Sequence, residues 1–388
     1  MIDYPEWEQA TPLMLVWVLL LYLYVLKDNW KQVVVPLEQL GGYTFRESRK
    51  IFFLLIIFAL TCFCNGDFFH SIVPVHYMDS KWMVTPNFHY EIVYQYIAKF
   101  TDGNYLLWRL IVWGGAILLI TLTAKRIGCS IKQTLFIVFA LYAVQYSYAR
   151  STLAQSIYFY GLSFLIAPNL RKGRISNIVL ALVIISIAPF FHRSAYLLLA
   201  STPIVFLPNI SNKKSMFYIF LYVSFIAIAT VLMSKVIFDL DLLSITDDER
   251  LVTKFENYTD AEDDENREGG IAKRLIIWLT NLSIFVILYK IVTSLVRNGV
   301  ENMNQNDGYL KISFCIIAAS LTLNFCGPEF YVISYRYGIM SFIPFSITIS
   351  NLYKQRVFNF KDFKLIIFVG IVPLAYRLLY STYLSIIK

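Results

Sequence analysis

Long apolar runs recur along the whole chain, and short polar or charged segments separate them. An α-helix needs about 20 mostly apolar residues to cross a bilayer. By that criterion about twelve runs are predicted to span a membrane, near residues 10–26, 51–65, 105–124, 131–148, 152–168, 176–190, 194–208, 215–237, 273–296, 310–326, 332–352 and 365–385. The pattern therefore predicts an all-α fold: a polytopic integral membrane helical bundle, with residues 1–388 as a single membrane domain.

The loops between these runs alternate in charge. Lys and Arg concentrate in the loops near 27–50, 125–130, 169–175, 209–214, 297–309 and 353–364. Cytoplasmic loops of membrane proteins are enriched in Lys and Arg, so these loops are predicted to be cytoplasmic. An even number of spans then places both termini on the extracytoplasmic side. The first nine residues carry three acids and no base, unlike a cleaved signal peptide, so we expect the first run to remain a membrane helix.

Two predicted extracytoplasmic segments are long enough to have structure of their own. Segment 66–104 holds three of the four histidines, and residues 87–100 within it are predicted to form an amphipathic helix. Its apolar positions recur at helical spacing, at Tyr90, Val93, Ile97 and Phe100. Segment 238–271 is strongly acidic and is predicted to be a solvated lid or loop. We find no internal repeat and no separate soluble domain.

The composition excludes a soluble globular or a disordered protein. Hydrophobic residues make up 57% of the chain and charged residues 15%, with a mean hydropathy of +0.58. Soluble domains are about 45–50% apolar and about 25% charged. The net charge of +8 follows from the basic loops, so we expect no nucleic-acid partner. The five cysteines form no C-x-x-C pair and are predicted to be small buried hydrophobes; we expect no metal site and no cofactor.

Charged side chains collect in turns on the predicted outer side of the membrane. Arg150 lies between the fourth and fifth runs, His192 and Arg193 lie between the sixth and seventh, and Arg336 opens the eleventh. Ionisable groups at membrane depth usually mark functional sites. The competing interpretation is that they are interfacial anchors whose charged ends reach the lipid head groups.

These residue types suit a lipid diphosphate. Guanidinium groups bind phosphate bidentately and stay charged, so Arg150, Arg336 and Arg193 are candidate diphosphate ligands. A departing diphosphate is the charge that grows in a glycosyl-transfer transition state. His192 or Glu91 is the candidate base for an acceptor hydroxyl. Neighbouring side chains that are candidates for weaker contacts with a glycan are Tyr94, Gln155 and Tyr335. The D-x-D spacing of Asp239 and Asp241 is a weak signal in an acidic segment.

Four short segments resemble the EpsG family of bacterial multi-pass proteins, which are encoded with exopolysaccharide and capsule genes and are similar to Wzy polymerases. The segments are His89–Tyr94, Tyr148–Ser156, Phe190–Tyr196 and Tyr335–Gly338. In the family an Arg-Gln pair opens the helix that carries Arg150, whereas here Ser151 follows and Gln155 comes a turn later.

The resemblance implies a membrane glycosyltransferase of the bacterial inner membrane. It would join repeat units carried on undecaprenyl diphosphate, on the periplasmic face, during exopolysaccharide, capsule or O-antigen biosynthesis. A chain-length regulator and a flippase are the implied partners, besides the lipid bilayer. The alternatives are a transporter or flippase for a lipid-linked glycan, a non-catalytic membrane assembly protein, and a membrane O-acyltransferase.

Overall fold

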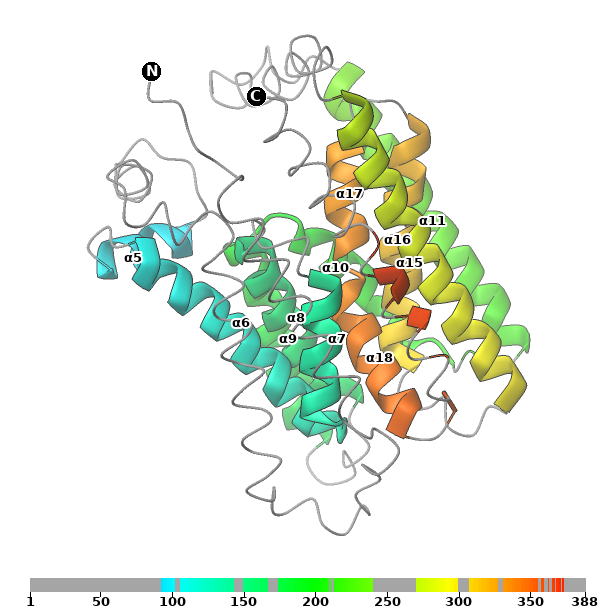
Figure 1. Cartoon of the computed structure of the whole chain (residues 1–388), viewed down its shortest axis with the longest axis horizontal. Coiled ribbons are helices and arrows are strands. Elements are labelled where there is room, and N and C mark those ends of the chain that lie inside the picture. Colours follow the sequence, from blue (N-terminus) through cyan, green and yellow to red (C-terminus); the bar gives the residue numbers. More distant parts are fainter. Residues whose placement is uncertain are drawn as a thin grey trace. The chain divides into compact units, whose positions relative to one another are not determined.

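The computed structural model describes residues 92–101, 105–142, 149–166, 174–208, 210, 213–239, 270–298, 307–326, 331–354, 357–358, 362, 365–366, 368–370 and 372. Within these residues every regular element is a helix, so the all-α prediction is confirmed there (Figure 1). The helices are α5 (Ile92–Phe100), α6 (Tyr105–Ile127), α7 (Ile131–Tyr142), α8 (Ala149–Ile166), α9 (Arg174–Phe191), α10 (Ala195–Ser201), η4 (Thr202–Phe206), α11 (Lys213–Asp239), α15 (Gly270–Asn298), α16 (Asp307–Cys326), α17 (Tyr331–Ile339) and α18 (Phe342–Lys354).

Three of the described helical stretches are long and apolar enough to cross a membrane: Leu110–Ile127, Ile277–Leu295 and Asp307–Cys326. Shorter apolar stretches lie in α9, α10 with η4, and α11. The chain is therefore a membrane protein by length and composition of its helices. The predicted runs at 10–26 and 51–65, and most of 365–385, 66–104 and 238–271, lie outside the described residues. The total of about twelve spans and the side of the termini stay predictions.

One predicted run is divided in the structure. Residues 332–352 were expected to form one span, but α17 ends at Ile339 and α18 begins at Phe342. Pro344 has no N–H to donate to the carbonyl of Met340, so a continuous helix would lose that hydrogen bond. The chain instead closes a turn, in which the Met340 N–H donates to the Tyr337 carbonyl at 2.9 Å and the Ser341 hydroxyl donates to the Gly338 carbonyl at 2.7 Å.

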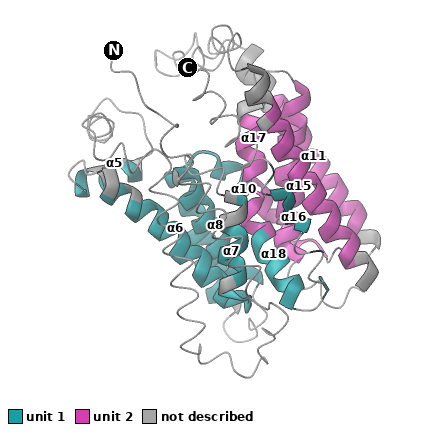
Figure 2. Ribbon diagram, viewed as in Figure 1, with its two compact units in different colours: residues 1–199, 346–388 teal, residues 200–345 magenta. Residues whose placement is uncertain are grey.

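The chain divides into two compact units (Figure 2). Unit 1 comprises Met1–Leu199 and Ser346–Lys388, and unit 2 comprises Ala200–Phe345. In unit 1, α8 packs against both α6 and α9, and α5 contacts α6 and α9. Residues 152–159 of α8 are buried on every side, as expected for a central helix. The outward side of α9 is apolar and exposed, as expected for a surface in lipid, at Ile175, Val179, Leu182, Val183, Ile187 and Phe190.

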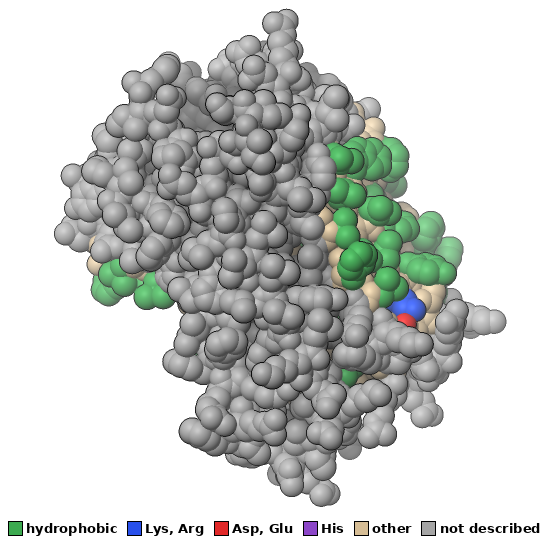
Figure 3. Space-filling view, in the orientation of Figure 1, with side chains coloured by type: hydrophobic (Ala, Val, Ile, Leu, Met, Phe, Trp, Pro, Cys, Tyr) green, Lys and Arg blue, Asp and Glu red, His purple; other side chains and the backbone are tan. Residues whose placement is uncertain are grey.

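In unit 2, α16 lies at the centre. It packs against α11, α17 and η4, while α15 packs against α17. Figure 3 shows hydrophobic side chains gathered on the outside of the region that α11 and α15 occupy in Figure 1. The exposed large side chains there include Phe217, Phe220, Phe225, Leu232, Trp278, Leu282, Phe285 and Tyr289. An exposed apolar surface of this extent suits lipid and would be unfavourable in water.

The described cysteines behave as predicted. Cys129 and Cys315 are buried, and Cys326 is half-buried. Burial raises the pKa of the Cys129 thiol, in the turn after α6, to about 12, which outweighs the opposite effect of the nearby Lys354 ammonium. The thiol is therefore protonated and unreactive near neutral pH.

A glycine permits the close packing of α8 on α9. A Cβ atom at Gly161 would lie 2.9 Å from the Ile185 side chain and 3.0 Å from that of Ile184. A Cβ atom at Gly114, on α6, would meet no such neighbour within 4 Å. Both glycines are inside helices, so alanine adds the same helix propensity at each, about 1 kcal/mol.

We therefore expect Gly161→Ala to lower the thermal unfolding temperature of the detergent-solubilised protein relative to Gly114→Ala. The overpacking at Gly161 should cost about 1–3 kcal/mol. Gly114→Ala should leave the unfolding temperature unchanged or slightly raised. Equal unfolding temperatures for the two variants would contradict the close α8–α9 packing.

Candidate functional site

Arg150 lies in the first turn of α8, and a buried tyrosine fixes the backbone there. The Tyr94 hydroxyl donates to the Arg150 carbonyl at 2.8 Å. The Arg150 guanidinium carbon lies 5.8 Å from the centre of the Tyr94 ring, within the range of a cation–π contact. The side chain of Arg150 is half-buried. Tyr94 therefore holds both the backbone and the guanidinium of Arg150.

Tyr94 itself is enclosed by aromatic side chains. It is fully buried, its ring centre lies 5.8 Å from that of Trp108, and it meets Phe191 edge-on at 6.1 Å. These contacts join α5, α6 and α9 around the start of α8. Of the predicted amphipathic helix over 87–100, the structure describes Ile92–Phe100, in which Tyr94 is fully buried and Phe100 is 80% exposed.

The start of α8 is electrostatically suited to an anion. The first backbone N–H groups of a helix have no partner within the helix, and the helix dipole places partial positive charge at that end. Arg150 adds a full positive charge at the same place. The combination of guanidinium and helix N-terminus is well matched to a phosphate group.

The turn after α9 carries His192 and Arg193. The Ser194 N–H donates to His192 Nδ1 at 3.2 Å, and the Ser194 hydroxyl lies 2.6 Å from the same atom. Because a backbone N–H can only donate, this network assigns the Nδ1 lone pair as an acceptor and places the proton of the neutral ring on Nε2. His192 in this form is a hydrogen-bond donor through Nε2. Arg193 is exposed in the same turn.

Arg336 lies on α17 in unit 2, and two hydrogen bonds join this helix to α16. The Ser320 hydroxyl donates to the Ser334 carbonyl at 2.8 Å, and the Ser334 hydroxyl donates to the Ser320 carbonyl at 2.7 Å. Gly338 lies one turn after Ser334, and a Cβ there would lie 3.0 Å from the Ser320 hydroxyl oxygen. Small residues four apart let helices approach closely in membranes. Arg336 is half-buried on this fixed helix.

The structure places the other predicted site residues as follows. Tyr94, Gln155 and Tyr335 were expected to contact a glycan, but their side chains are 0%, 1% and 7% exposed, so they lie inside their units. Glu91 precedes the first described residue and lies outside the described residues, as does Asp241. Unit 1 brings Tyr94, Arg150 and Phe191 together; Arg336 belongs to unit 2. Within the described part of the chain, no three His, Cys, Asp or Glu side chains are grouped as metal ligands.

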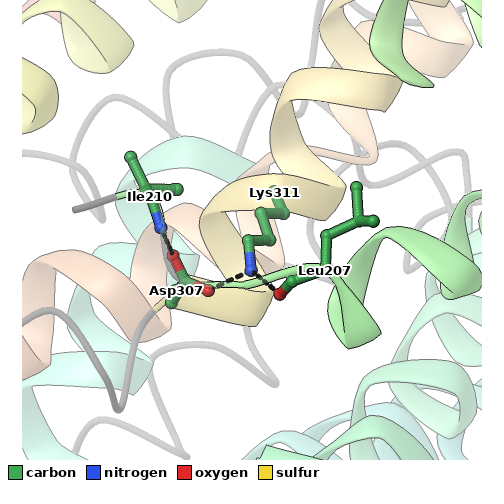
Figure 4. A network of polar contacts seen from close by, with 4 residues as sticks. All are labelled: Leu207, Ile210, Asp307 and Lys311. Atoms are coloured by element: carbon green, nitrogen blue, oxygen red, sulfur yellow. Dashed lines mark hydrogen bonds and ion pairs between the residues drawn. The ribbon is translucent and has the colours of Figure 1, made fainter. Parts of the chain in front are cut away.

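A buried ion pair in unit 2 was not expected from the sequence. Lys311 and Asp307 form a salt bridge one turn apart on α16, and the Lys311 side chain is fully buried (Figure 4). The Lys311 ammonium also donates to the Leu207 carbonyl at 2.8 Å, and the Ile210 N–H donates to the Asp307 carboxylate at 2.9 Å. The pair therefore ties the segment between η4 and α11 to the first turn of α16. The available signal was an acid and a base at i, i+4 where the apolar run begins.

This position suits a structural role. Asp307 lies in the first turn of α16, where a carboxylate is favoured by the helix dipole. Its charge neutralises Lys311, and the two backbone partners occupy further donors and acceptors of the pair. A buried pair of this kind is costly to break on one side and inexpensive to replace on both.

Two single variants and the double variant test this pair. Asp307→Asn and Lys311→Met each leave one buried charge uncompensated, so each should lower the free energy of unfolding by about 3–5 kcal/mol. The double variant should be more stable than the sum of the two single losses, as measured by thermal unfolding in detergent. Strictly additive losses would show that the two side chains do not interact.

The fold and these contacts define a helical membrane protein with cationic side chains near helix ends that hydrogen bonds and aromatic contacts hold in place. Comparison with known families matches residues 51–387 to the EpsG family. The chain belongs to the EpsG family, which confirms the resemblance seen in its short motifs. No curated protein and no solved structure matches the chain.

Proposed function

We propose that this protein is a polysaccharide polymerase that joins oligosaccharide repeat units carried on undecaprenyl diphosphate. The reaction would take place on the periplasmic face of a bacterial inner membrane, in exopolysaccharide, capsule or O-antigen biosynthesis. Membership of the EpsG family supports a Wzy-like polymerase. The observation that carries the proposal is Arg150, held by Tyr94 at the N-terminus of α8, where a diphosphate is well matched.

In the proposed reaction the growing glycan moves from its lipid carrier to a hydroxyl of a new lipid-linked unit. A bond forms between the anomeric carbon of the growing chain and the acceptor oxygen, while the bond from that carbon to the diphosphate oxygen breaks. The electron pair leaves with undecaprenyl diphosphate, and the proton of the acceptor hydroxyl passes to a base. Negative charge therefore grows on the diphosphate in the transition state.

The chain's residues divide these tasks in the proposal. Arg150, Arg336 and Arg193 bind the diphosphate, and Arg150 does so together with the N-terminus of α8. His192 donates from Nε2 to the departing group, since its Nδ1 accepts from Ser194. Glu91 is then the proposed base. Tyr94 acts as a positioning residue for Arg150. A flippase would supply the lipid-linked units, and a chain-length regulator would set product size.

A transporter of lipid-linked glycan is the second candidate, and one feature favours it. The break between α17 and α18 divides a predicted span near its middle, and interrupted helices are typical of transporter binding sites. In a transporter, loss of the site would leave lipid-linked units on the cytoplasmic side of the membrane. In a polymerase, single units would accumulate on the outer side.

The length of the cellular polysaccharide tests the proposal. Arg150→Ala, His192→Ala and Arg336→Ala should each reduce long chains to single repeat units on a gel, with at least a hundredfold loss of polymer for Arg150→Ala, because an oriented charge contact at a growing charge supplies about 2.7–4 kcal/mol. Lys99→Ala, which removes an exposed cation of α5, should leave long chains. Immunoblots of membranes control for insertion. Normal chain length in all three variants would contradict the proposal.

A second pair of variants separates positioning from binding in the same assay. Tyr94→Phe removes only the hydroxyl that holds the Arg150 carbonyl, so it should shorten the chains less than Arg150→Ala does. Tyr96→Phe removes the hydroxyl of a tyrosine on the same helix that is 64% exposed, and it should have no effect.

A further inference from the structure

Two cations at the opposite end of α8 from Arg150 are not used in the proposed reaction. α8 has 18 residues, so its ends are about 27 Å apart at about 1.5 Å per residue. Near its last turn, the guanidinium of Arg126 lies over the Phe164 ring, 3.5 Å from the ring centre. Lys354, in the last turn of α18, donates to the carbonyl of Gly128. Arg126 and Lys354 thus lie beside the same short turn between α6 and α7, and we name them the basic pair.

The backbone that carries the basic pair is rigidly fixed. Gly128 has a φ of +78°, which a side chain would strain, and it ends α6. The Cys129 N–H donates to the Ala124 carbonyl at 2.8 Å, and the Ser350 hydroxyl donates to the Ser130 carbonyl at 3.3 Å. α6, α7 and α18 are therefore joined at this turn, and the two cations are held in place before any ligand arrives.

Arg126 differs from an ordinary surface cation. Its Nε atom is buried and has no hydrogen-bond partner among the described residues. Of the salt bridges formed among the described residues, the only one is that of Lys311 with Asp307, in unit 2. The side chain as a whole is half-buried, so the N–H groups at the edge of the stacked guanidinium, and not the covered Nε, are those that a ligand can reach. The adjacent Lys125 is exposed, as a solvated cation would be.

We propose that Arg126 and Lys354 bind the phosphate of an anionic lipid head group. The membrane-crossing stretch Leu110–Ile127 ends one residue after Arg126, which places the pair at the depth of the head groups. The basic loops predict that this end is cytoplasmic, where anionic lipids attract Lys and Arg beside membrane helices. Arg126 supplies planar, paired donors to the phosphate, and Lys354 supplies the ammonium donors that Gly128 does not use.

Thermal unfolding of the purified full-length protein with added lipid tests this site. The quantity to compare is the rise in unfolding temperature with phosphatidylglycerol minus the rise with phosphatidylcholine, which cancels any loss of intrinsic stability. Lys125→Gln should reduce this difference less than Arg126→Gln does, because the exposed Lys125 ammonium supplies only a screened, non-specific attraction. Arg126→Gln and Lys354→Gln should reduce it by at least half and weaken the apparent affinity about tenfold. An unchanged difference in Arg126→Gln would overturn the proposal; if that variant does not fold, Lys354→Gln decides in the same way.

A polyprenyl phosphate offers the same chemistry as a phospholipid and is separated from it by competition. If polyprenyl phosphate displaces phosphatidylglycerol at equimolar concentration and its effect is lost in Arg126→Gln, the occupant is the carrier lipid. If phosphatidylglycerol prevails and its effect depends on Arg126, the occupant is bulk membrane lipid. If the stabilising effect of neither lipid depends on Arg126, the site is contradicted. The outcome is independent of glycan polymerisation, so it stands or fails apart from the proposed function.

Discussion

A single hydrogen bond, from the buried Tyr94 hydroxyl to the carbonyl of Arg150, fixes the first turn of α8, which carries the Arg150 guanidinium. A buried hydroxyl needs a partner, and this one finds it in the first turn of the central helix. The aromatic ring then supports the guanidinium. The result is a positive side chain at the positive end of a helix dipole, an arrangement that suits a bound anion.

The described cations differ in how their charge is compensated. Lys311 is neutralised by Asp307 on its own helix and satisfied by backbone groups, which makes it part of the fold. Arg126 is half-buried, stacked on Phe164 and close to the end of a membrane-crossing stretch, which suits an anionic ligand from the membrane. Whether an acidic side chain of the protein neutralises the charge, more than location in an apolar run, distinguishes structural cations from candidate ligand-binding cations here.

Hydropathy predicted the helices well because apolar length is a local property. The runs at 105–124, 215–237, 273–296 and 310–326 correspond to α6, α11, α15 and α16 within a few residues. The break at Met340 was missed because an average over a window does not register the N–H that Pro344 lacks. The Asp307–Lys311 pair was missed because an average over a window also hides two single charged residues at the start of an apolar run. Tyr94 was selected as a candidate, but its burial depends on contacts with Trp108 and Phe191, which lie on two other helices. The short motifs sufficed for the family, which the match over 51–387 confirms.

Reconstitution measures the central claim most directly. The purified protein in proteoliposomes is given a polyprenyl-diphosphate-linked repeat unit as its only substrate. Our account predicts glycans of two or more repeat units, the release of one polyprenyl diphosphate for each new linkage, and the loss of both products in Arg150→Ala. If the protein is folded and all glycan stays at the length of one unit, with no diphosphate released, the account is contradicted.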